Sequence, residues 1–497
     1  MSSAGSDGPA PAAHRHDHIR LVGDPRRVIA KPFLPGEQIF PDGRSRLEVV
    51  STRIMNLTEV EVRETLDAVL EGFVGRHRDF VAVLERHHLL VAERLGLPEG
   101  LTPERRLLIG AYFTHEYSVE AAALGNPSMV AAPDQSGLGE GETRFVMSLR
   151  AVGEGHISSV EFRSGVIGPD AAIVLDPPSR YAATGHRTTP TYDRGFFRTK
   201  MADLGALNDV ATVVLDSLGD HFTMADLTEA ILALDGQGVG RAAASETVHD
   251  LHWLASSNYR LAFEPSTDLS ERVIFPGGPT ESRGMEDVRL VRFVHDDGDV
   301  VYYGTYTAFD GHTILPQLVE TRDFASFRIA TLSGESAQNK GIALFPRKLD
   351  GHFVALGRHD NVNNFLMTSD DVRVWRETEK IQEPERPWEL IQLGNCGSPI
   401  ETEAGWLVIT HGVGPMRSYT LGALLLDIDD PYRVIGHLKE PLLAPTGGER
   451  EGYVPNVVYS CGGMIHDGHL VLPYGYADVG ASIVTVCLDD LLTRLLG

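Results

Sequence analysis

The sequence predicts a mainly β protein: a five-bladed β-propeller with an N-terminal helical segment and a helical insertion. Most of the chain after residue 125 consists of short runs rich in Val, Ile, Tyr and Phe, separated by turns that contain Asp-Gly or a lone Gly. Such runs are typical of β-strands joined by hairpins. Four of the turns recur at steps of 53, 54 and 63 residues, with their glycines at Gly298, Gly351, Gly405 and Gly468. A fixed period of about this length is typical of propeller blades.

A fifth copy of the repeat is predicted earlier in the chain. The segment GLGEGETRFVMSLR places its turn at Gly141, which is 157 residues before Gly298. A helical insertion at about 201–258 accounts for the extra length, because apolar residues there return to helical spacing. Five copies lie within the usual range of blade numbers. Residues 125–497 are therefore predicted to form the propeller.

Residues 1–18 are expected to be a disordered tail. They are rich in Ser, Gly, Pro and Ala, and such a segment cannot bury enough apolar surface to offset the entropy lost on ordering. His14, His16 and His18 are candidate metal ligands, but a flexible tract holds no fixed coordination geometry. We therefore predict no metal site.

Residues 19–124 are predicted to be largely helical. From Leu57 to Leu95 the apolar residues recur mostly at steps of three and four, which is the period of an α-helix. Thr58 and Glu61 form a capping box at the start of this stretch. A second helix is predicted over Thr102–Leu124, with proline at its first helical position.

Composition and charge exclude several classes of function. The chain carries 69 acidic and 44 basic residues, a net charge of −25, so nucleic acid and anionic membranes are not expected partners. The N-terminus has no apolar core of the signal-peptide type, and no window is apolar enough for a membrane helix. The three cysteines have no metal-ligand spacing and are an odd number. We therefore expect a cytoplasmic protein.

The repeat also predicts the position of a functional pocket. In each copy the strand after the turn ends on a large polar residue, and these residues are Arg150, Tyr306, Arg358, His411 and Tyr474. Equivalent strand ends of a propeller converge on one end of the central channel, so we expect these side chains in a single pocket. Arg150, Arg358 and His411, with Lys340 added, form a positive cluster in an acidic protein, which indicates an anion such as phosphate or a carboxylate. There is no P-loop, so a nucleotide is not expected.

A pair of carboxylates, Glu286 and Asp287, precedes a strand and is flanked by Arg283 and Arg289. On a regular extended chain only one of two neighbours faces the pocket. Glycosidic cleavage requires a proton donor, and an inverting hydrolase also requires a second carboxylate about 6.5–9.5 Å away. A bound phosphate that is itself the nucleophile makes the second carboxylate unnecessary. The alternative is that this segment is a surface turn held by ion pairs.

From Gly125 to the C-terminus, with the helical insertion set aside, a series of longer motifs follows. They are NPSMV with the strand that ends at Arg150, then GMEDVR, TYTAFDG, NKGIALFPRK, GRHD, GSPIETEAGWLVITHGV, GALLLDIDDPYRVIG, EGYVPNVVYSCG and YGYAD. In this order they resemble the inverting β-mannoside phosphorylases and β-mannosidases of glycoside hydrolase family 130. The resemblance implies the five-bladed β-propeller of that family.

The resemblance also implies roles for individual residues. Asp287 is the counterpart of the family's general acid, which works through a hydroxyl of the bound mannose, and Val288 stands where the family usually has proline. The residues similar to the family's phosphate-binding set are Arg150, Lys340, Arg358, His411 and Tyr419. The residues expected to bind the mannoside are Asn126, Asp478, Arg289 and Tyr306.

The retained cations favour phosphorolysis of a β-mannoside, which yields α-mannose 1-phosphate and a shortened sugar. The expected substrates are an oligosaccharide or small mannoside and inorganic phosphate as co-substrate, with no metal or organic cofactor. One alternative is a β-mannosidase on the same fold, in which Asp287 donates the proton and Glu451 or Asp478 activates water. Another is a propeller that binds carbohydrate without cleaving it. The helical segments could cap the pocket or build a subunit interface, so a homo-oligomer is compatible with the sequence.

Overall fold

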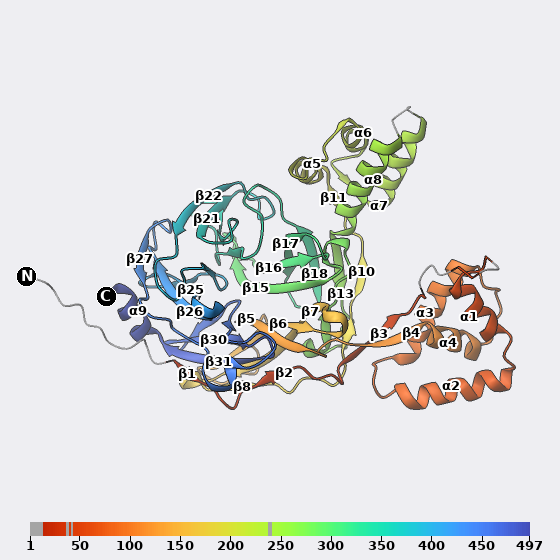
Figure 1. The fold of residues 1–497 in the computed structure, drawn as a ribbon, viewed down its shortest axis with the longest axis horizontal. Helices are drawn as coiled ribbons and strands as arrows, with labels where there is room; N and C mark the ends of the chain where they lie inside the picture. Colours follow the sequence, from red (N-terminus) through yellow and green to blue (C-terminus); the bar gives the residue numbers. More distant parts are fainter. Residues whose placement is uncertain (1–12, 36–38, 41–42, 237–240) are drawn as a thin grey trace, which may run out of the picture.

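The structure is a computed structural model that describes residues 13–35, 39–40, 43–236 and 241–497. It is mainly β: sheets form the body of the molecule, and two groups of helices project from it (Figure 1). The helices of residues 46–112 lie at one end, and those of residues 194–256 lie at the top of the view. Among the described residues, no helix is both long enough and apolar enough to cross a bilayer.

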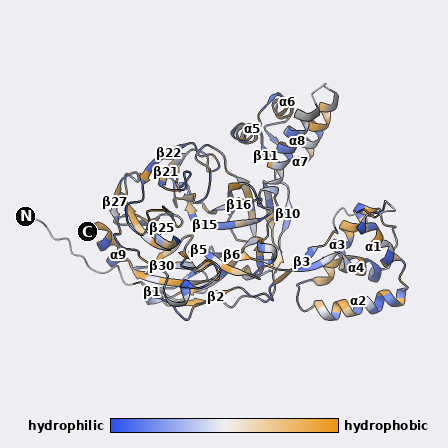
Figure 2. Ribbon diagram, viewed as in Figure 1, coloured by the Kyte–Doolittle hydropathy of each residue, from blue (hydrophilic) through white to orange (hydrophobic). Residues whose placement is uncertain are grey.

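The N-terminal helices are α1 (Arg46–Met55), α2 (Glu59–Phe73), α3 (Phe80–Leu95) and α4 (Pro103–Tyr112). The predicted capping box is confirmed at the start of α2, where the Thr58 hydroxyl accepts from the Glu61 backbone N–H and the Glu61 carboxylate accepts from the Thr58 N–H. Figure 2 shows hydrophobic and hydrophilic residues alternating around α2. The apolar sides of the helices share one cluster that contains Val62, Val91 and Leu108.

The second predicted helix is shorter than expected. It ends at Tyr112 rather than near Leu124, and the chain continues as β4 (Thr114–Ser118) and β5 (Ala123–Ala131). The alanine-rich end of the predicted helix pairs with β6 (Thr143–Val152), and the Leu124 side chain is buried in the core between sheets. Strand pairing and burial therefore outweigh the helix propensity of alanine.

Antiparallel strands follow one another in five groups along the described chain. The first group contains β5, β6, β7 (Ser158–Ile167) and β8 (Ile173–Leu175). The second contains β15 (Gly284–Val294), β16 (Val300–Phe309), β17 (Ile314–Thr321) and β18 (Ser326–Thr331). The third contains β19 (Ala343–Leu344), β20 (Phe353–Gly357), β21 (Asn364–Ser369) and β22 (Glu377–Gln382).

The last two groups complete the series. The fourth contains β23 (Gln392–Asn395), β24 (Ile400–Thr402), β25 (Gly405–Val413), β26 (Tyr419–Leu426) and β27 (Val434–His437). The fifth contains β28 (Val458–Tyr459), β29 (Met464–His466), β30 (His469–Tyr476) and β31 (Gly480–Cys487). The C-terminal helix α9 (Leu488–Leu496) buries Leu491 and Leu495 against this end of the molecule.

Shorter strands extend these sheets. The first and second groups belong to one 12-stranded sheet, because β15 pairs with β7 at Gly284 and Ser158. The same sheet includes β9 (Ala183–Thr184), β10 (His186–Thr188), β13 (Tyr259–Ala262) and β14 (Arg272–Ile274).

Separate hydrophobic clusters join each group of strands to the next. Val146 of the first group packs in one cluster with Leu290 of the second, and other clusters join the second group to the third, the third to the fourth and the fourth to the fifth. A further cluster contains Met147 of the first group and Ile483 of the fifth. The five groups therefore pack in a cyclic order.

The predicted hairpin glycines are confirmed as turn residues. Each stands at the start of a strand of its group or in the turn before it, and these strands are β6, β16, β20, β25 and β30; the φ angles lie between 69° and 143°. This conformation is readily available only to glycine. The glycines are Gly141, Gly298, Gly351, Gly405 and Gly468.

Part of the expected N-terminal tail is ordered. Strand β1 (His14–Arg15) pairs with β31, as does β2 (Leu21–Val22). The His16 ring, which is 8% exposed, places Nε2 at 3.2 Å from the Thr485 hydroxyl. The expectation of disorder is therefore wrong for these residues, because they complete the edge of a sheet. Residues 1–12 lie outside the described residues.

The helical insertion forms a separate cluster of its own. Its helices are α5 (Arg194–Asp203), α6 (Asp209–Ser217), α7 (Met224–Leu232) and α8 (Arg241–Ser256), and the short strands β11 (Tyr192–Asp193) and β12 (His221–Phe222) pair beside them. The buried Lys200 ammonium donates to the Leu332 carbonyl at 2.7 Å, and the Asp203 carboxylate accepts from the Gly334 N–H at 2.7 Å. These contacts fix the insertion to the segment after β18.

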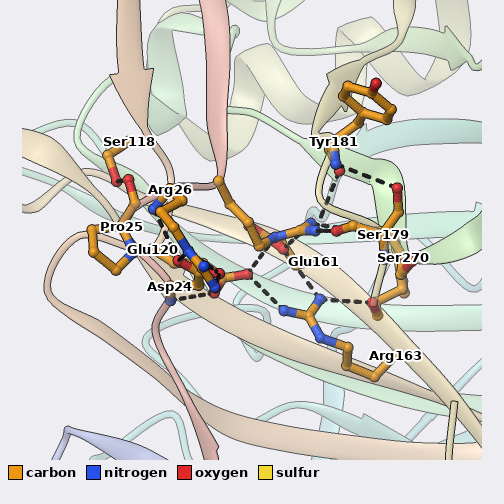
Figure 3. Close-up of polar contacts among 12 residues, drawn as sticks. Asp24, Pro25, Arg26, Ser118, Glu120, Glu161, Arg163, Ser179, Tyr181 and Ser270 are labelled. Carbon is orange, nitrogen blue, oxygen red and sulfur yellow. Dashed lines mark hydrogen bonds and ion pairs between the residues drawn. The ribbon is translucent and has the colours of Figure 1, made fainter. Parts of the chain in front are cut away.

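A buried ion network fixes the N-terminal chain just before β3 (Val28–Pro32), which pairs with β4. Arg27 Nε lies 2.7 Å from Glu120 Oε1, and its Nη2 donates to Glu161 Oε2 at 2.8 Å. Arg163 contacts the same two carboxylates, at 2.6 and 3.2 Å. Figure 3 shows Glu120, Glu161 and Arg163 converging across the strands. All four side chains are at most 4% exposed, so the network connects the strand that leads to the helices with β7.

Candidate active site

Two β-bulges place the candidate catalytic residues. The register of β15 against β16 shifts directly after Glu286, and that of β5 against β6 shifts directly after Gly125. Asp287 and Asn126, which lie in these bulges, have φ of 58° and 47°, and Asp478 after β30 has φ of 52°. This left-handed conformation is costly for residues other than glycine and concentrates at functional sites.

The bulge directs both neighbouring carboxylates toward Arg150. Arg150 Nη2 donates to Glu286 Oε1 at 2.7 Å, and its Nη1 lies 3.6 Å from Asp287 Oδ1. The expectation that only one of the two faces the pocket is therefore wrong, because it assumed a regular strand. The two carboxylate side chains are 15% and 14% exposed, so the segment is not an exposed turn either.

Asp287 is a carboxylate that is held by a hydrogen bond and by several nearby cations. Its Oδ1 accepts a hydrogen bond from Asn126 Nδ2 at 2.5 Å. Burial by itself raises the pKa of Asp287, but Arg150, Lys340, the hydrogen bond from Asn126 and Arg289 together hold this pKa below its ordinary value. These neighbours therefore favour the ionised form of the carboxyl.

Glu286 connects the two most accessible cations. Its Oε1 accepts from Arg150, and its Oε2 accepts from Lys340 Nζ at 2.6 Å. Lys340 follows Asn339, whose φ is 58°, and precedes Gly341, whose φ is 98°. A Cβ on Gly341 would lie 3.0 Å from Arg289 Nη1, so only glycine lets the backbone pass this close to the guanidinium.

Two further guanidiniums of the site, those of Arg289 and Arg358, are buried. Arg289 is 3% exposed, and its Nη1 and Nη2 donate to Asn395 Oδ1 at 3.0 Å and to the Tyr459 hydroxyl oxygen at 2.7 Å. Arg358 is 7% exposed, and its Nη1 donates to His411 Nε2 at 3.0 Å. Within the part of the chain that the structure describes, neither forms an ion pair with a carboxylate.

His411 is neutral. The positive cluster predicted from the sequence included His411 as a cation, but the structure gives it no positive charge. Its Nε2 has to accept from Arg358, because a guanidinium only donates. Burial, then Arg358 and Arg289, hold the pKa of His411 well below its ordinary value of 6.5. The other ring nitrogen, Nδ1, lies 3.6 Å from Cys396 Sγ. The Tyr419 ring lies nearly parallel to the His411 ring, with centroids 6.2 Å apart.

Two of the five predicted strand-end residues have their hydroxyls directed elsewhere. The Tyr306 hydroxyl donates to buried Glu281 at 2.9 Å, and the Tyr474 hydroxyl donates to Glu449 at 2.6 Å. The Tyr306 side chain still lines a cavity with Asp287 and other residues of the site. Side chains alternate between the two faces of a strand, so offsets of six to nine residues from the turn cannot place all five on one side.

A second cavity lies on the side of β5 and β30, beside Asn126 and Arg150, which contact Asp287. It is lined by Asn126, Arg150 and Asp478, and also by His156 and Tyr453. The rings of His156 and Tyr453 are stacked, with their centroids 5.7 Å apart. The pKa of Asp478 is raised above its ordinary value, because the effect of burial is larger than the opposing effect of the nearby Arg150.

The structure adds residues to the site that the sequence did not single out. Asn395 orients Arg289 and also donates to the Gly341 carbonyl at 2.7 Å, and Tyr459 accepts from the same guanidinium. Tyr459 lies in the motif EGYVPNVVYSCG, and Asn395 lies two residues before the motif that begins GSPI, but the contacts of both depend on which strands are neighbours. The alternative base Glu451 is exposed to solvent.

The chain is similar to a family of known proteins. Residues 241–495 match the model of a family described as beta-1,4-mannooligosaccharide phosphorylase. The chain is 36% identical over 219 residues to the 1,2-beta-oligomannan phosphorylase of Thermoanaerobacter sp., a match that covers 42% of this chain and 71% of the relative. It is 29% identical over 232 residues to the beta-1,2-mannobiose phosphorylase of Listeria innocua, with coverage of 45% and 63%.

A solved structure is also similar. It is the beta-1,2-mannobiose phosphorylase from Listeria innocua in complex with beta-1,2-mannobiose. The alignment has a TM-score of 0.45 and 21% sequence identity, and covers 76% of this chain and 93% of the other.

Proposed function

Because the chain belongs to glycoside hydrolase family 130, we propose that it cleaves β-mannosides by inverting phosphorolysis. The products are α-mannose 1-phosphate and a sugar shortened by one mannose. One observation carries the choice of phosphate: Arg289 and Arg358 are buried guanidiniums that form no ion pair with a carboxylate among the described residues, and Arg289 is near enough to Asp287 to lower its pKa. A buried, unpaired charge is costly, and a bound anion would offset it.

The proposed phosphate site uses the residues that the resemblance implied. Arg150, Lys340 and Arg358 supply charge, and Arg358 has capacity left for a planar, two-point contact with phosphate oxygens. Neutral His411 and the Tyr419 hydroxyl supply polar contacts rather than charge. On the other side, Asn126 and Asp478 line the second cavity, and we propose that they hold the mannose that is cleaved, with Arg289 and Tyr306 beside them.

The chemistry requires one proton donor. A phosphate oxygen attacks the anomeric carbon from the α face while the bond to the leaving oxygen breaks, and the proton of Asp287 reaches that oxygen through a mannose hydroxyl. The positive side chains stabilise the phosphate in the transition state. Asp287 has to be protonated for this step. A mannose and a phosphate dianion bound beside it would desolvate it and offset the neighbouring cations, and both effects raise its pKa.

We infer a five-bladed β-propeller as the fold that carries the site. The five groups of antiparallel strands and their cyclic order of hydrophobic clusters support it. Residues from β5, β6, β15 and the segments after β18 and β20 contribute to one site, which is expected where strands from several blades converge. A reducing cytoplasm is our proposal for the compartment, because the three cysteines are unpaired.

Incubation of the full-length protein with β-1,2- and β-1,4-mannobiose, each with and without phosphate, tests the function. Phosphorolysis predicts mannose 1-phosphate in the tubes with phosphate and no turnover without it. Free mannose at equal rates in both tubes would identify a hydrolase, with Asp478 as the candidate base. Binding without turnover under every condition would identify a carbohydrate-binding protein.

A further inference from the structure

We propose that Glu286 is an internal competitor for inorganic phosphate. Its carboxylate occupies Arg150 and Lys340 in the phosphate-free enzyme and leaves these cations when phosphate binds. The inference rests on the proposed function, because it assumes that phosphate is a substrate. It adds an exchange of one anion for another to the binding step.

The contacts show that the two cations are already occupied. Glu286 Oε1 lies 2.7 Å from Arg150 Nη2, and its Oε2 lies 2.6 Å from Lys340 Nζ. The remaining terminal nitrogen of Arg150 faces Asp287 at 3.6 Å. A carboxylate bridging two cations presents two oxygens in the way that phosphate would. Phosphate therefore cannot contact Lys340 fully while Glu286 stays in place.

The carboxylate of Glu286 is held only by the groups that phosphate would need. Among the described residues it accepts from Arg150 and Lys340 and from no backbone N–H. Asp287 differs, because Asn126 also holds it. Glu286 is 15% exposed and Lys340 is 33% exposed, so the carboxylate has a route to solvent and the flexible lysine can follow the new anion.

The position of the unpaired cation brings phosphate to this pair. Arg289 already donates from both terminal nitrogens, to Asn395 and Tyr459, whereas Arg358 donates from one, to His411, so Arg358 has the larger number of donors left for an anion. Arg358 lies next to the residue that follows Lys340, since a Cβ on Gly341 would be 3.5 Å from Arg358 Cβ. A phosphate held by Arg358 is thus close to the Lys340 chain and competes with Glu286 for it.

Substitution separates competition from support. If Glu286 competes, Glu286→Gln removes the charge at nearly constant size and phosphate binds more tightly, by about 10-fold or ~1.4 kcal/mol. If Glu286 instead holds Arg150 and Lys340 in position for phosphate, the same variant binds phosphate more weakly. The two roles therefore predict changes of opposite sign.

Titration calorimetry with inorganic phosphate on the full-length parent, Glu286→Gln and Glu401→Gln tests the proposal. Glu401 pairs with Arg347 at the surface, so its variant has the same change in net charge and is expected to bind like the parent. We expect the KM for phosphate to fall in Glu286→Gln while the KM for the mannoside changes little. An unchanged or weaker phosphate affinity in Glu286→Gln would overturn the proposal.

A second variant and the activity of the parent enzyme separate the role of Glu286 from the proposed function. Glu286→Asp shortens the side chain so that it cannot bridge both cations, and we expect an intermediate gain in phosphate affinity; this variant replaces Glu286→Gln if the latter does not fold. A parent enzyme that forms mannose 1-phosphate while Glu286→Gln and Glu286→Asp bind phosphate no better than it does contradicts only the role of Glu286. A parent that neither binds phosphate nor forms mannose 1-phosphate contradicts the proposed function as well.

Discussion

At the scale of single residues, the cations of the site differ in how their charge is balanced. Arg150 and Lys340 share the carboxylate of Glu286, whereas Arg358 donates to the neutral His411 and forms no ion pair within the described ranges of the chain. The free energy of burying an unpaired guanidinium is unfavourable. Arg358 is therefore the residue whose contribution should depend most on a bound anion.

Substitution of Arg358 by Met is expected to raise the KM for phosphate by about 100-fold, since charge-assisted hydrogen bonds are worth roughly 1.5–3 kcal/mol. The melting temperature without phosphate should stay the same or rise, because an unpaired buried charge is removed. Thermal melts with and without phosphate check both effects. Arg347→Met, which removes an exposed arginine paired with Glu401, is the control. A normal phosphate KM in Arg358→Met would contradict the assigned phosphate site.

Asp287→Asn is expected to lower turnover of mannobiose about 1000-fold, within the range of general acid catalysis. The fold should be retained, because asparagine tolerates the left-handed φ of this position. Rates should be compared between mannobiose and a nitrophenyl β-mannoside, whose leaving group needs no proton. A smaller loss on the nitrophenyl substrate is expected, and equal losses on both would exclude Asp287 as the proton donor.

The sequence predicted which types of side chain the site contains, but not how these side chains contact one another. Arg150, Arg358 and Lys340 were found from strand ends and charge, and the structure places Arg150 and Lys340 around one carboxylate. The sequence did not predict that His411 is neutral, because the charge of His411 depends on the neighbouring guanidinium of Arg358. Tyr306 and Tyr474 were assigned to a shared pocket, but the side of the strand was not fixed by the spacing.

At the scale of elements, the bulges in β5 and β15 determine the active geometry. Each turns a polar residue toward the other strand, so that Asn126 reaches Asp287. The hairpin glycines were predictable, because an Asp-Gly or lone glycine between apolar runs indicates a turn. The bulges were not predictable, since no local pattern in NPSMV or GMEDVR marks them. The end of α4 was missed for a similar reason, because strand pairing in the folded protein determines where this helix ends.

Gly341→Ala is a test of the segment that carries Lys340. Gly341 has φ of 98°, and its Cβ would press on Arg289, whereas Gly351 has φ of 82° with open space around it. Both alanine variants should lose about 1 kcal/mol of stability from backbone strain. Only Gly341→Ala should raise the phosphate KM. Similar kinetics in the two variants would show that this close approach does not matter for the site.

The buried network before β3 gives a second prediction at this scale. Glu120→Gln leaves Arg27 and Arg163 with one carboxylate fewer, and we expect the free energy of unfolding to fall by ~3 kcal/mol. Urea unfolding measures this change. Glu99→Gln, at an exposed position of the same N-terminal region, should have no measurable effect. A stability equal to that of the parent would show that the network does not anchor this strand.

At the scale of the whole molecule, five groups of strands pack in a cyclic order, and two helical segments attach to the outside (Figure 1). The repeat of turn glycines predicted five groups of strands along the chain, because each group repeats the same hairpin. The tail was predicted from composition alone, which does not show that His14 and Arg15 pair with the last strand.

Phosphorus NMR of the full-length protein with β-mannobiose and inorganic phosphate tests the phosphorolysis most directly. We expect the phosphate signal to decrease and the signal of α-mannose 1-phosphate to grow in step with the loss of disaccharide. Release of free mannose with an unchanged phosphorus spectrum would contradict phosphorolysis and identify water as the nucleophile.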